Sequence, residues 1–214
     1  MLRKFAKLEL NRLLAHLRSL DFTVLGPKIE DEAIVYSQVD SLADLPRGYA
    51  DSQQPGKYRL LQAEHHYHFE FNLGPHSWKQ FLFPPRVSLS TARLDSNGWT
   101  FETPHQSAPK LAFLGVRACE LAAIAAQDRV FLHGPYVDPI YKSRREAVLI
   151  IAVNCTVAAA TCFCTSMQTG PKCQAGFDLA LTELDACFVV EVASPRGAEI
   201  LEAIDTQSAT PLDI

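Results

Sequence analysis

The residues with the most distinctive chemistry are four cysteines, Cys119, Cys155, Cys162 and Cys164. Each of them lies where an apolar run ends and small or polar residues begin. In a chain without a recognisable secretion signal, thiolates gathered at the ends of core elements are better explained as metal ligands than as disulfides. With four sulfur ligands and no nearby histidine, the candidates are an iron–sulfur cluster and structural zinc.

The surroundings of these cysteines favour the thiolate form that a metal ion binds. Cys119 lies at the start of a predicted helix, where free N–H groups and the helix macrodipole attract negative charge. Arg117 lies two residues before it. The small, polar segment 165–170 includes Ser166 and Thr169, which offer N–H and O–H donors that could bond to sulfur and tune a reduction potential. We therefore expect Arg117, Ser166 and Thr169 to lie beside the cofactor.

Other interpretations of the cysteines stay open. Free cysteine is among the most buried residue types, so the four could be small core side chains. Structural zinc usually takes two short Cys-x2–4-Cys knuckles, and the spacing here does not match, which favours iron. The ferredoxin run of closely spaced cysteines ending in Cys-Pro is also absent, so the motif is only moderately specific. Cys173 could replace a ligand or lie idle, and Cys187 resembles a packing residue.

Composition and charge are those of an ordinary globular protein. Hydrophobic residues make up 48% of the 214, so a core can form without cross-links. The net charge of −4 and the lack of a basic block argue against nucleic acid as the main partner. The longest apolar run, 147–153, is too short to span a membrane. The N-terminal segment lacks the continuous hydrophobic centre of a signal peptide, so we expect a cytoplasmic location, where cysteines stay reduced.

The first half of the chain predicts one helix and then a mostly β region. Apolar residues from Leu2 to Leu17 recur at helical spacing, which predicts a helix over 2–19. Short apolar or alternating runs follow, and Asn97-Gly98 is a good hairpin turn between two of them. The predicted strands lie at 22–25, 33–36, 58–62, 67–71, 87–92 and 99–102.

From Pro109 an alternation of strand and helix points to an α/β unit with parallel pairing. The expected strands are 110–115, 148–153 and 188–192, and the expected helices are 117–130, 176–185 and 196–206. In such a unit, ligands collect beyond the carboxyl ends of the strands. Cys119 and Cys155 each follow a strand, so they should lie at the same edge of the sheet.

The expected fold is therefore a mixture of α+β and α/β structure with a partly parallel sheet. An N-terminal helix and β-rich region would occupy residues 1–105, and a small cysteine-bearing α/β unit would occupy 106–214. The boundary near residue 105 is soft, and the two parts could form one domain.

Several other groups have simple explanations. In the run 65–68, His-His-Tyr-His, two histidines would share one face of an expected strand, as a metal site requires. The opposite face is formed by Tyr67, Phe69 and Phe71, which favours an amphipathic strand with one solvated face. Asp178 and Glu183 are interpreted as helix-start and surface residues. Segment 143–146 matches a capping box, but the apolar sequence after it argues against a helix there. No dinucleotide fingerprint, Walker loop or nucleophile elbow is present, which argues against independent nucleotide or hydrolase chemistry.

Several segments together resemble a known family. FLGVRACELAAI, QDRVFLHGPYVDPIYKSRRE, VNCT, CFCTSMQTGP and GFDLALTEL are similar to the N-terminal part of the β subunits of cytoplasmic sulfhydrogenases. They are equally similar to the A subunit of anaerobic sulfite reductases. PGKYRL and GPHSWKQFLFPP in the first half also resemble that family. The resemblance covers most of residues 45–195, and the cysteine segment is its most specific part.

The resemblance implies an iron–sulfur electron-transfer subunit rather than a self-sufficient enzyme. Of the family's [4Fe-4S] clusters, this chain would hold one, on Cys119, Cys155, Cys162 and Cys164. Electrons would pass between a flavin-containing NAD(P)H reductase partner, which carries FAD, and a catalytic subunit acting on hydrogen, polysulfide or sulfite. The alternative is a non-redox scaffold whose cysteines hold structural zinc and whose surface docks partners.

Two features depart from the family pattern. Members usually continue into a ferredoxin-like domain with two further clusters, whereas this chain ends at Ile214 without those cysteines. We therefore expect either a truncated form or a relay completed by another polypeptide. Gln168 stands where relatives tend to have glycine, and Ala118 where they tend to have proline. Glycine at 168 would suit a close backbone approach or a positive φ, so the loop around Gln168 could differ in shape from that of the relatives. Neither change removes a sulfur ligand.

Overall fold

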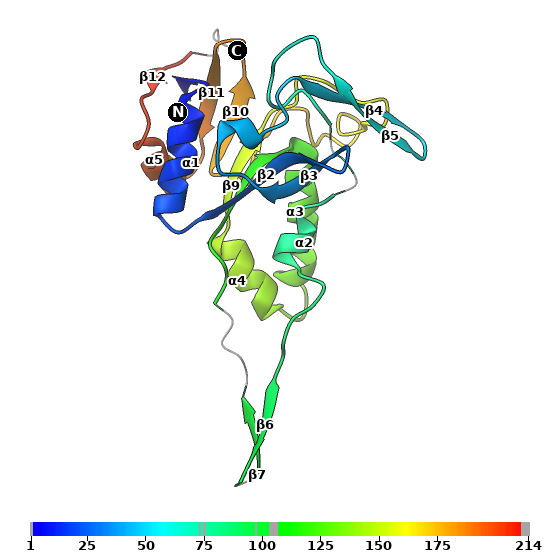
Figure 1. The fold of residues 1–214 in the computed structure, drawn as a ribbon, viewed down its shortest axis with the longest axis vertical. Coiled ribbons are helices and arrows are strands. Elements are labelled where there is room, and N and C mark those ends of the chain that lie inside the picture. Colours follow the sequence, from blue (N-terminus) through cyan, green and yellow to red (C-terminus); the bar gives the residue numbers. More distant parts are fainter. Residues whose placement is uncertain (1, 73, 75, 97, 103–106, 211–214) are drawn as a thin grey trace.

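A computed structural model describes residues 2–210, except 73, 75, 97 and 103–106. Its centre is an eight-stranded sheet with the strand order β12-β1-β11-β10-β9-β8-β2-β3 (Figure 1). The strands of this sheet are β1 (Leu2–Ala6), β2 (Thr23–Glu30), β3 (Ala33–Gln38), β8 (Leu111–Val116), β9 (Leu149–Val153), β10 (Leu179–Glu183), β11 (Cys187–Val192) and β12 (Gln207–Ser208).

Four neighbouring strands form the parallel centre of the sheet. β9 pairs in parallel with β8 and β10, and β8 pairs in parallel with β2. Every residue of β9 is buried, as expected for a strand covered on both faces. β11 is antiparallel to β10, and β1 is antiparallel to β11, so β1 runs in the direction of the parallel strands. The carboxyl ends of β1, β8, β9 and β10 therefore lie along one edge.

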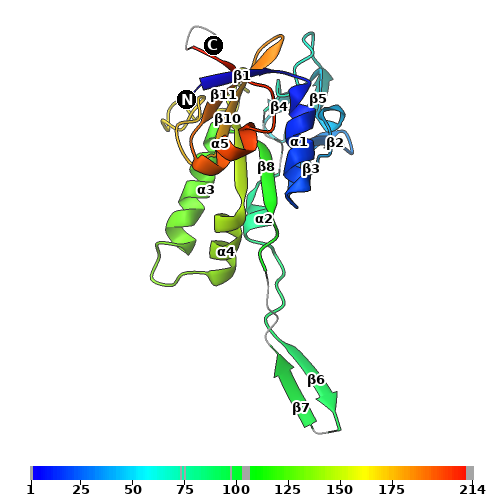
Figure 2. The same cartoon turned by 90° about the vertical axis from the view of Figure 1, so that its left-hand side faces the viewer.

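Helices cover both faces of the sheet (Figures 1 and 2). One face carries α1 (Glu9–Ser19) and α5 (Pro195–Leu201). The other carries α2 (Lys79–Leu82), α3 (Ala118–Phe131) and α4 (Pro139–Ala147). Alternate residues of β9 belong to the two resulting core layers, because successive side chains of a strand point to opposite faces. None of the described helices is long and apolar enough to cross a membrane.

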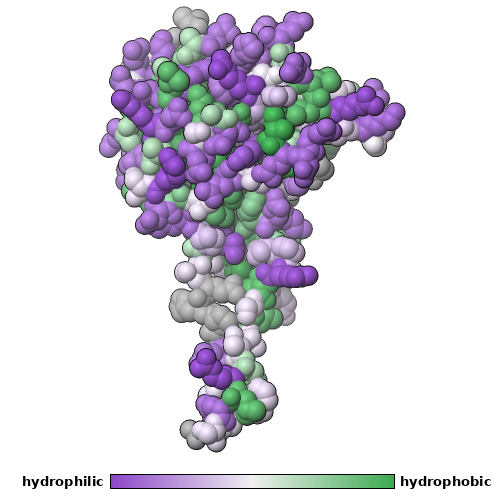
Figure 3. All heavy atoms as spheres, viewed as in Figure 1, coloured by the Kyte–Doolittle hydropathy of each residue, from purple (hydrophilic) through white to green (hydrophobic). Residues whose placement is uncertain are grey.

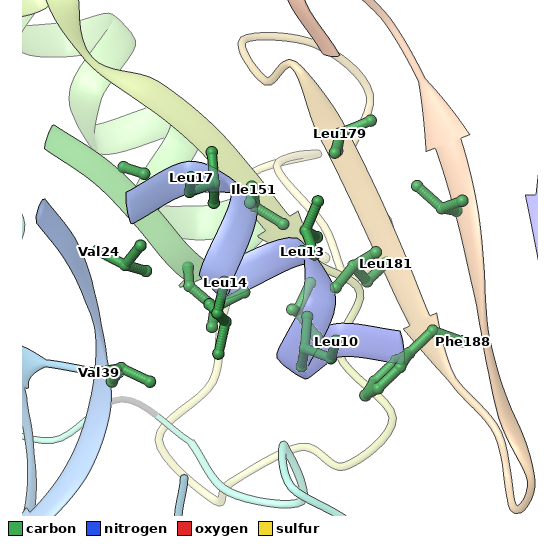
Figure 4. Packing of buried hydrophobic residues seen from close by; sticks show 14 of the residues in the cluster. Leu10, Leu13, Leu14, Leu17, Val24, Val39, Ile151, Leu179, Leu181 and Phe188 are labelled. Carbon is green, nitrogen blue, oxygen red and sulfur yellow. The ribbon is translucent and has the colours of Figure 1, made fainter. Parts of the chain in front are cut away.

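The leucines of α1 supply much of the core on their side of the sheet (Figure 4). Leu10, Leu13, Leu14 and Leu17 recur at helical spacing, and all four are fully buried. Burial of each leucine stabilises the fold by about 1.5–3 kcal/mol. This packing fixes α1 across the sheet and holds the turn between β1 and α1 at the carboxyl edge.

Two antiparallel hairpins and one short 3-10 helix lie outside the main sheet. The 3-10 helix is η1 (Leu42–Asp44), and the hairpins are β4 (Tyr49–Gln54) with β5 (Lys57–Gln62) and β6 (Thr91–Asp95) with β7 (Gly98–Glu102). The β6–β7 hairpin projects from the body as an arm (Figure 2). Its surface carries both hydrophilic and apolar side chains (Figure 3), and Leu94 pairs with Trp99 across its strands.

The expected mixed fold with a partly parallel sheet is confirmed. In the second half, the predicted strands at 110–115, 148–153 and 188–192 correspond to β8, β9 and β11, and the helix at 117–130 corresponds to α3. In the first half, β2, β3 and β5 occupy three of the predicted strand positions. The hairpin strands beside Asn97-Gly98 are also present, while Asn97 lies outside the described residues. The expected domain boundary near residue 105 lies outside them too.

The prediction of a single helix over 2–19 is wrong for its first residues. Residues 2–6 form β1, because their backbone groups pair with β11 on one side and β12 on the other. Phe5 is buried there against Phe188, with ring centroids 5.6 Å apart. The prediction of a helix over 176–185 is also wrong. Leu179–Glu183 is β10, a buried strand between β9 and β11, so sheet pairing overrides the helical preference of its Ala and Leu residues.

Three further differences concern an absent strand, the end of one helix and a helix that was not expected. The strand predicted at 67–71 is absent, because backbone groups of this segment bond to the side chains of Glu183 and Arg117 instead of a neighbouring strand. The helix predicted at 196–206 ends as α5 at Leu201. No helix was expected over 139–147, where α4 lies. Asp138 accepts hydrogen bonds from two N–H groups of its first turn, which is typical of a helix start.

Candidate metal centre

The carboxyl ends of β8 and β9 carry the first two of the four cysteines. Cys119 is the second residue of α3, just after β8, and Cys155 lies two residues after the end of β9. Because β8 and β9 are parallel neighbours, both residues lie at the same edge of the sheet. The loop from 154 to 178 starts at this edge and carries Cys162 and Cys164 before it returns to β10.

Close packing brings this loop back onto the first turn of α3. A Cβ atom on Gly170 would lie 3.2 Å from the Cβ of Ala118 and 3.2 Å from the Sγ of Cys164. Cys164 therefore lies beside Ala118, the residue that precedes Cys119. The N–H of Cys155 donates to the carbonyl of Pro171 at 3.3 Å. Both cysteine-bearing segments after β9 are thus in contact with the same short stretch, 170–171.

The cysteines also influence one another electrostatically. Burial, with the charges of Glu120, Cys155 and Cys164, raises the pKa of Cys119 to about 11. Burial also raises the pKa of Cys155, and the charges of Cys164 and Cys162 raise it further. The Arg117 guanidinium lowers this pKa and so opposes the rise. These effects connect Cys119 with Cys155 and Cys164, and Cys155 with Cys162, so each of the four thiols has at least one of the others in its neighbourhood. A cation bound between them would reverse these shifts, because metal ligands must be thiolates.

The four sulfur atoms are nevertheless not arranged as a finished coordination site. In the described ranges, no group of three or more His, Cys, Asp or Glu side chains is placed so that it could hold a metal ion. Cys162 is exposed, and its thiol donates to the Oδ1 of Asn72 at 3.7 Å. The N–H of Ala159 donates to the same sulfur at 3.3 Å. The assignment of the four cysteines as ligands therefore stays a prediction.

Arg117 is a buried cation at this edge, with 1% of its surface exposed. One terminal nitrogen donates to the carbonyls of Phe69 and Phe71 at 2.7 and 2.9 Å, and the other to that of Asn154 at 3.4 Å. Its Nε is buried and has no hydrogen-bond partner among the described residues. The guanidinium thus joins the irregular segment 67–72 to the loop after β9, and its Nε–H has no acceptor among the described residues.

Glu120, which the sequence reasoning did not single out, lies beside Arg117 inside the protein. Its carboxylate accepts the N–H of Arg117 at 2.9 Å and the hydroxyl of Tyr36 at 2.7 Å. Burial raises the pKa of Glu120 to about 7, although these hydrogen bonds oppose the rise. A glutamate three residues after the helix N-cap is the acceptor half of a capping box, so the sequence did hold a signal for its position.

The two polar residues expected beside the cofactor differ in their surroundings. Thr169 is half-buried, and both its N–H and its hydroxyl donate to the carbonyl of Cys164, at 2.8 and 3.4 Å. It therefore shapes the loop backbone and does not donate to a sulfur atom. Ser166 is exposed. Gln168 has a φ of +56°, so the position where relatives tend to have glycine does adopt a left-handed conformation.

The two remaining cysteines have separate positions. Cys173 is buried, its N–H donates to the Oδ1 of Asn154 at 2.7 Å, and its thiol donates to the carbonyl of Val153 at 3.8 Å. Burial raises the pKa of Cys173 to about 12, which is consistent with a thiol kept protonated in the core. Cys187 begins β11 and pairs with Ala6 of β1, so it belongs to a different part of the sheet.

One curated relative is similar to part of this chain. The chain is 35% identical over 92 residues to sulfhydrogenase 2 subunit beta of Pyrococcus furiosus. The match covers 43% of this chain and 27% of the relative, so this chain accounts for only about a quarter of that protein's length. The resemblance to sulfhydrogenase β subunits is confirmed over that segment. No protein-family model and no solved structure matches the chain.

Proposed function

We propose that this chain is an iron–sulfur electron-transfer subunit of a multi-subunit oxidoreductase. One [4Fe-4S] cluster would be held by Cys119, Cys155, Cys162 and Cys164. The observation that carries the proposal is the packing at Gly170, which places Cys164 against the first turn of α3 although 45 residues separate it from Cys119. The similarity to a sulfhydrogenase β subunit supports the same function.

The residues of the site fit such a cluster in three respects. The donor set is sulfur only, which iron–sulfur clusters prefer. Arg117 supplies a buried positive charge, and its unused Nε–H is a donor for which the described residues offer no acceptor. The N–H of Ala159 already donates to a cysteine sulfur, and hydrogen bonds of this kind tune reduction potentials. The cluster would store one electron. This chain would bind the cluster through the four cysteine thiolates, partly exclude water from it and orient the hydrogen-bond donors around it.

The partners follow from the proposed family role. A flavin-containing NAD(P)H reductase subunit carrying FAD would exchange electrons on one side. A catalytic subunit acting on hydrogen, polysulfide or sulfite would do so on the other, and this chain would make or break no substrate bonds itself. We place the complex in the cytoplasm, because thiols stay reduced there. Cys162 lies on an exposed loop with Phe163 and Met167, which are 70% and 61% exposed, so the loop is accessible to a partner.

Zinc bound to the same cysteines in a non-redox scaffold is the second candidate. Its support is the sulfur-only donor set, which zinc also accepts. The long, irregular spacing of the ligands argues against it, because structural zinc usually uses paired knuckles. The two candidates differ in colour, in metal content and in acid-labile sulfide.

Anaerobic purification of the full chain tests the proposal. We expect a brown protein with about four iron and four sulfide per chain and broad visible absorption. Cys162→Ser and Cys164→Ser should each lower the iron content, whereas the matched control Cys187→Ser should not. Cys173→Ser should leave the iron content unchanged as well, because that thiol lies in the core. A colourless, folded and zinc-loaded chain would contradict the proposal, as would iron content that is unchanged after both loop substitutions.

A further inference from the structure

A pocket of about 310 Å³ lies at the same carboxyl edge, beside the turn that joins β1 to α1. It is separate from the cysteine loop and plays no part in the proposed function. Its polar lining includes Lys7, Arg47, His65 and His66 together with one carboxylate, Asp185, and its apolar lining includes Leu8 and Leu42. We call it the basic pocket. In α/β proteins, ligands bind beyond the carboxyl ends of parallel strands. Lys7 directly follows β1, which runs in the direction of those strands although its own pairings are antiparallel.

The carboxylates around the basic pocket are already engaged by hydrogen bonds. Glu183 is buried and accepts from the Nζ of Lys7 at 2.8 Å, from the Nδ1 of His68 and from two backbone N–H groups. Asp185 accepts the hydroxyl of Tyr67. The ion pair with Glu183 offsets the charge of Lys7, whose Nζ lies over the Tyr67 ring, 4.6 Å from its centroid.

Among the described residues, no carboxylate pairs with Arg47, His65 or His66, which also line the pocket. Arg47 is exposed, and its guanidinium has neither an ion pair nor a hydrogen bond within the described part of the chain. His65 and His66 are exposed as well. Gly48, with a φ of +75°, donates its N–H to the carbonyl of Tyr67 at 2.9 Å, and a Cβ there would lie 3.2 Å from the Nδ1 of His66. This turn therefore sets Arg47 beside the two histidines.

We propose that the basic pocket binds the phosphate group of a small organic phosphate. Arg47 supplies a planar pair of donors that suits phosphate oxygens, and Lys7, His65 and His66 supply further N–H donors. The Walker and dinucleotide motifs are absent from this sequence, so recognition would rest on side chains rather than on a glycine-rich loop.

The size and apolar part of the pocket indicate more than a bare oxyanion. Its volume is at the lower end of pockets that hold small organic ligands. The side chain of Leu8 is 72% exposed, and together with Leu42 and the Tyr67 ring it offers an apolar wall for an organic group. Leu8 is also the N-cap of α1, so no side chain caps that helix, and its positive end faces the same region.

Calorimetry on the cluster-loaded full chain tests the inference with three probes, namely AMP, inorganic phosphate and adenosine. We expect AMP to bind about ten-fold more tightly than either of the other two, because only AMP offers both the phosphate and the organic part. Arg47→Ala and His66→Gln should each weaken AMP binding by about five- to ten-fold. The control Arg129→Ala, on the exposed last turn of α3, should leave it unchanged.

The inference would be overturned if AMP showed no saturable binding, or if adenosine or inorganic phosphate bound as tightly as AMP. Unchanged AMP affinity in the Arg47→Ala and His66→Gln chains would overturn it too, because binding would then lie elsewhere. Circular dichroism and iron content of each variant show whether it remains folded and cluster-loaded. Both side chains are exposed, so we expect neither property to change.

Discussion

Gly170 lies where the cysteine loop packs against α3, and its replacement by alanine perturbs that contact alone. The new Cβ would lie 3.2 Å from both the Cβ of Ala118 and the Sγ of Cys164. Ordinary contacts between carbon atoms are about 3.5–4.0 Å, so the segment around Cys164 must move away from α3. Overpacking of this kind costs about 1–3 kcal/mol. The loss of unfolded-chain entropy offsets about 0.4–1 kcal/mol of that cost.

With the middle of each range, the net effect on the cluster-free chain is a loss of about 1.3 kcal/mol in unfolding free energy. For a chain of this size, each kcal/mol lowers the melting temperature by about 2–4 °C, which differential scanning fluorimetry resolves. Iron content of the reconstituted Gly170→Ala chain should fall as well, because Cys164 is displaced. Gly56→Ala is the matched control, since it meets open space and strains only the backbone at a φ of +70°. It should lower stability without lowering iron content. A Gly170→Ala chain with unchanged melting temperature and iron content would refute the reasoning.

Three further predictions concern single side chains. Gln168→Gly should raise the unfolding free energy by about 0.5–1 kcal/mol, because Gln168 holds a φ of +56° that glycine adopts without strain; a lower melting temperature would contradict this. Arg117→Lys keeps the charge but loses the planar donors to two backbone carbonyls, so urea unfolding should show a loss of about 1–3 kcal/mol, and an unchanged midpoint would count against it. Burial raises the pKa of Glu183, but hydrogen bonds from His68 and Lys7 outweigh it and hold that pKa below its ordinary value. Its contribution to stability is therefore present above about pH 4.5 and is lost as pH falls through the lowered pKa, so Glu183→Gln should flatten the acid limb of a stability–pH curve. A limb of unchanged slope would show that another group is responsible.

The elements that position the cysteines were predictable because their signals are local. Buried apolar runs of five or six residues indicate β8 and β9, and the Ala-rich sequence after Arg117 indicates α3. Once these strands are taken as parallel neighbours, the common edge of Cys119 and Cys155 follows from topology alone. The sulfur-only character of the site was also evident, since it depends on residue type.

The parts that could not be predicted depend on contacts between distant segments. Residues 2–6 carry the same apolar spacing as the helix that follows, and only the pairing with β11 makes them a strand. The burial of Glu183 requires knowledge of β10 and of Lys7, which lies 176 residues away. Segment 67–72 looks amphipathic, but Arg117 and Glu183 take its backbone bonds. The start of α4 is different, because Asp138 and Pro139 were a readable local signal that the interpretation passed over.

Iron and acid-labile sulfide, counted in the anaerobically purified Cys119→Ser chain beside Cys187→Ser, test the central claim most directly. Cys119 comes from α3, whereas the other proposed ligands come from the loop after β9, so its loss affects the cluster only if both elements share it. The account predicts that Cys119→Ser loses most of its iron and sulfide while Cys187→Ser keeps about four of each per chain. Full iron and sulfide in the Cys119→Ser chain would contradict it.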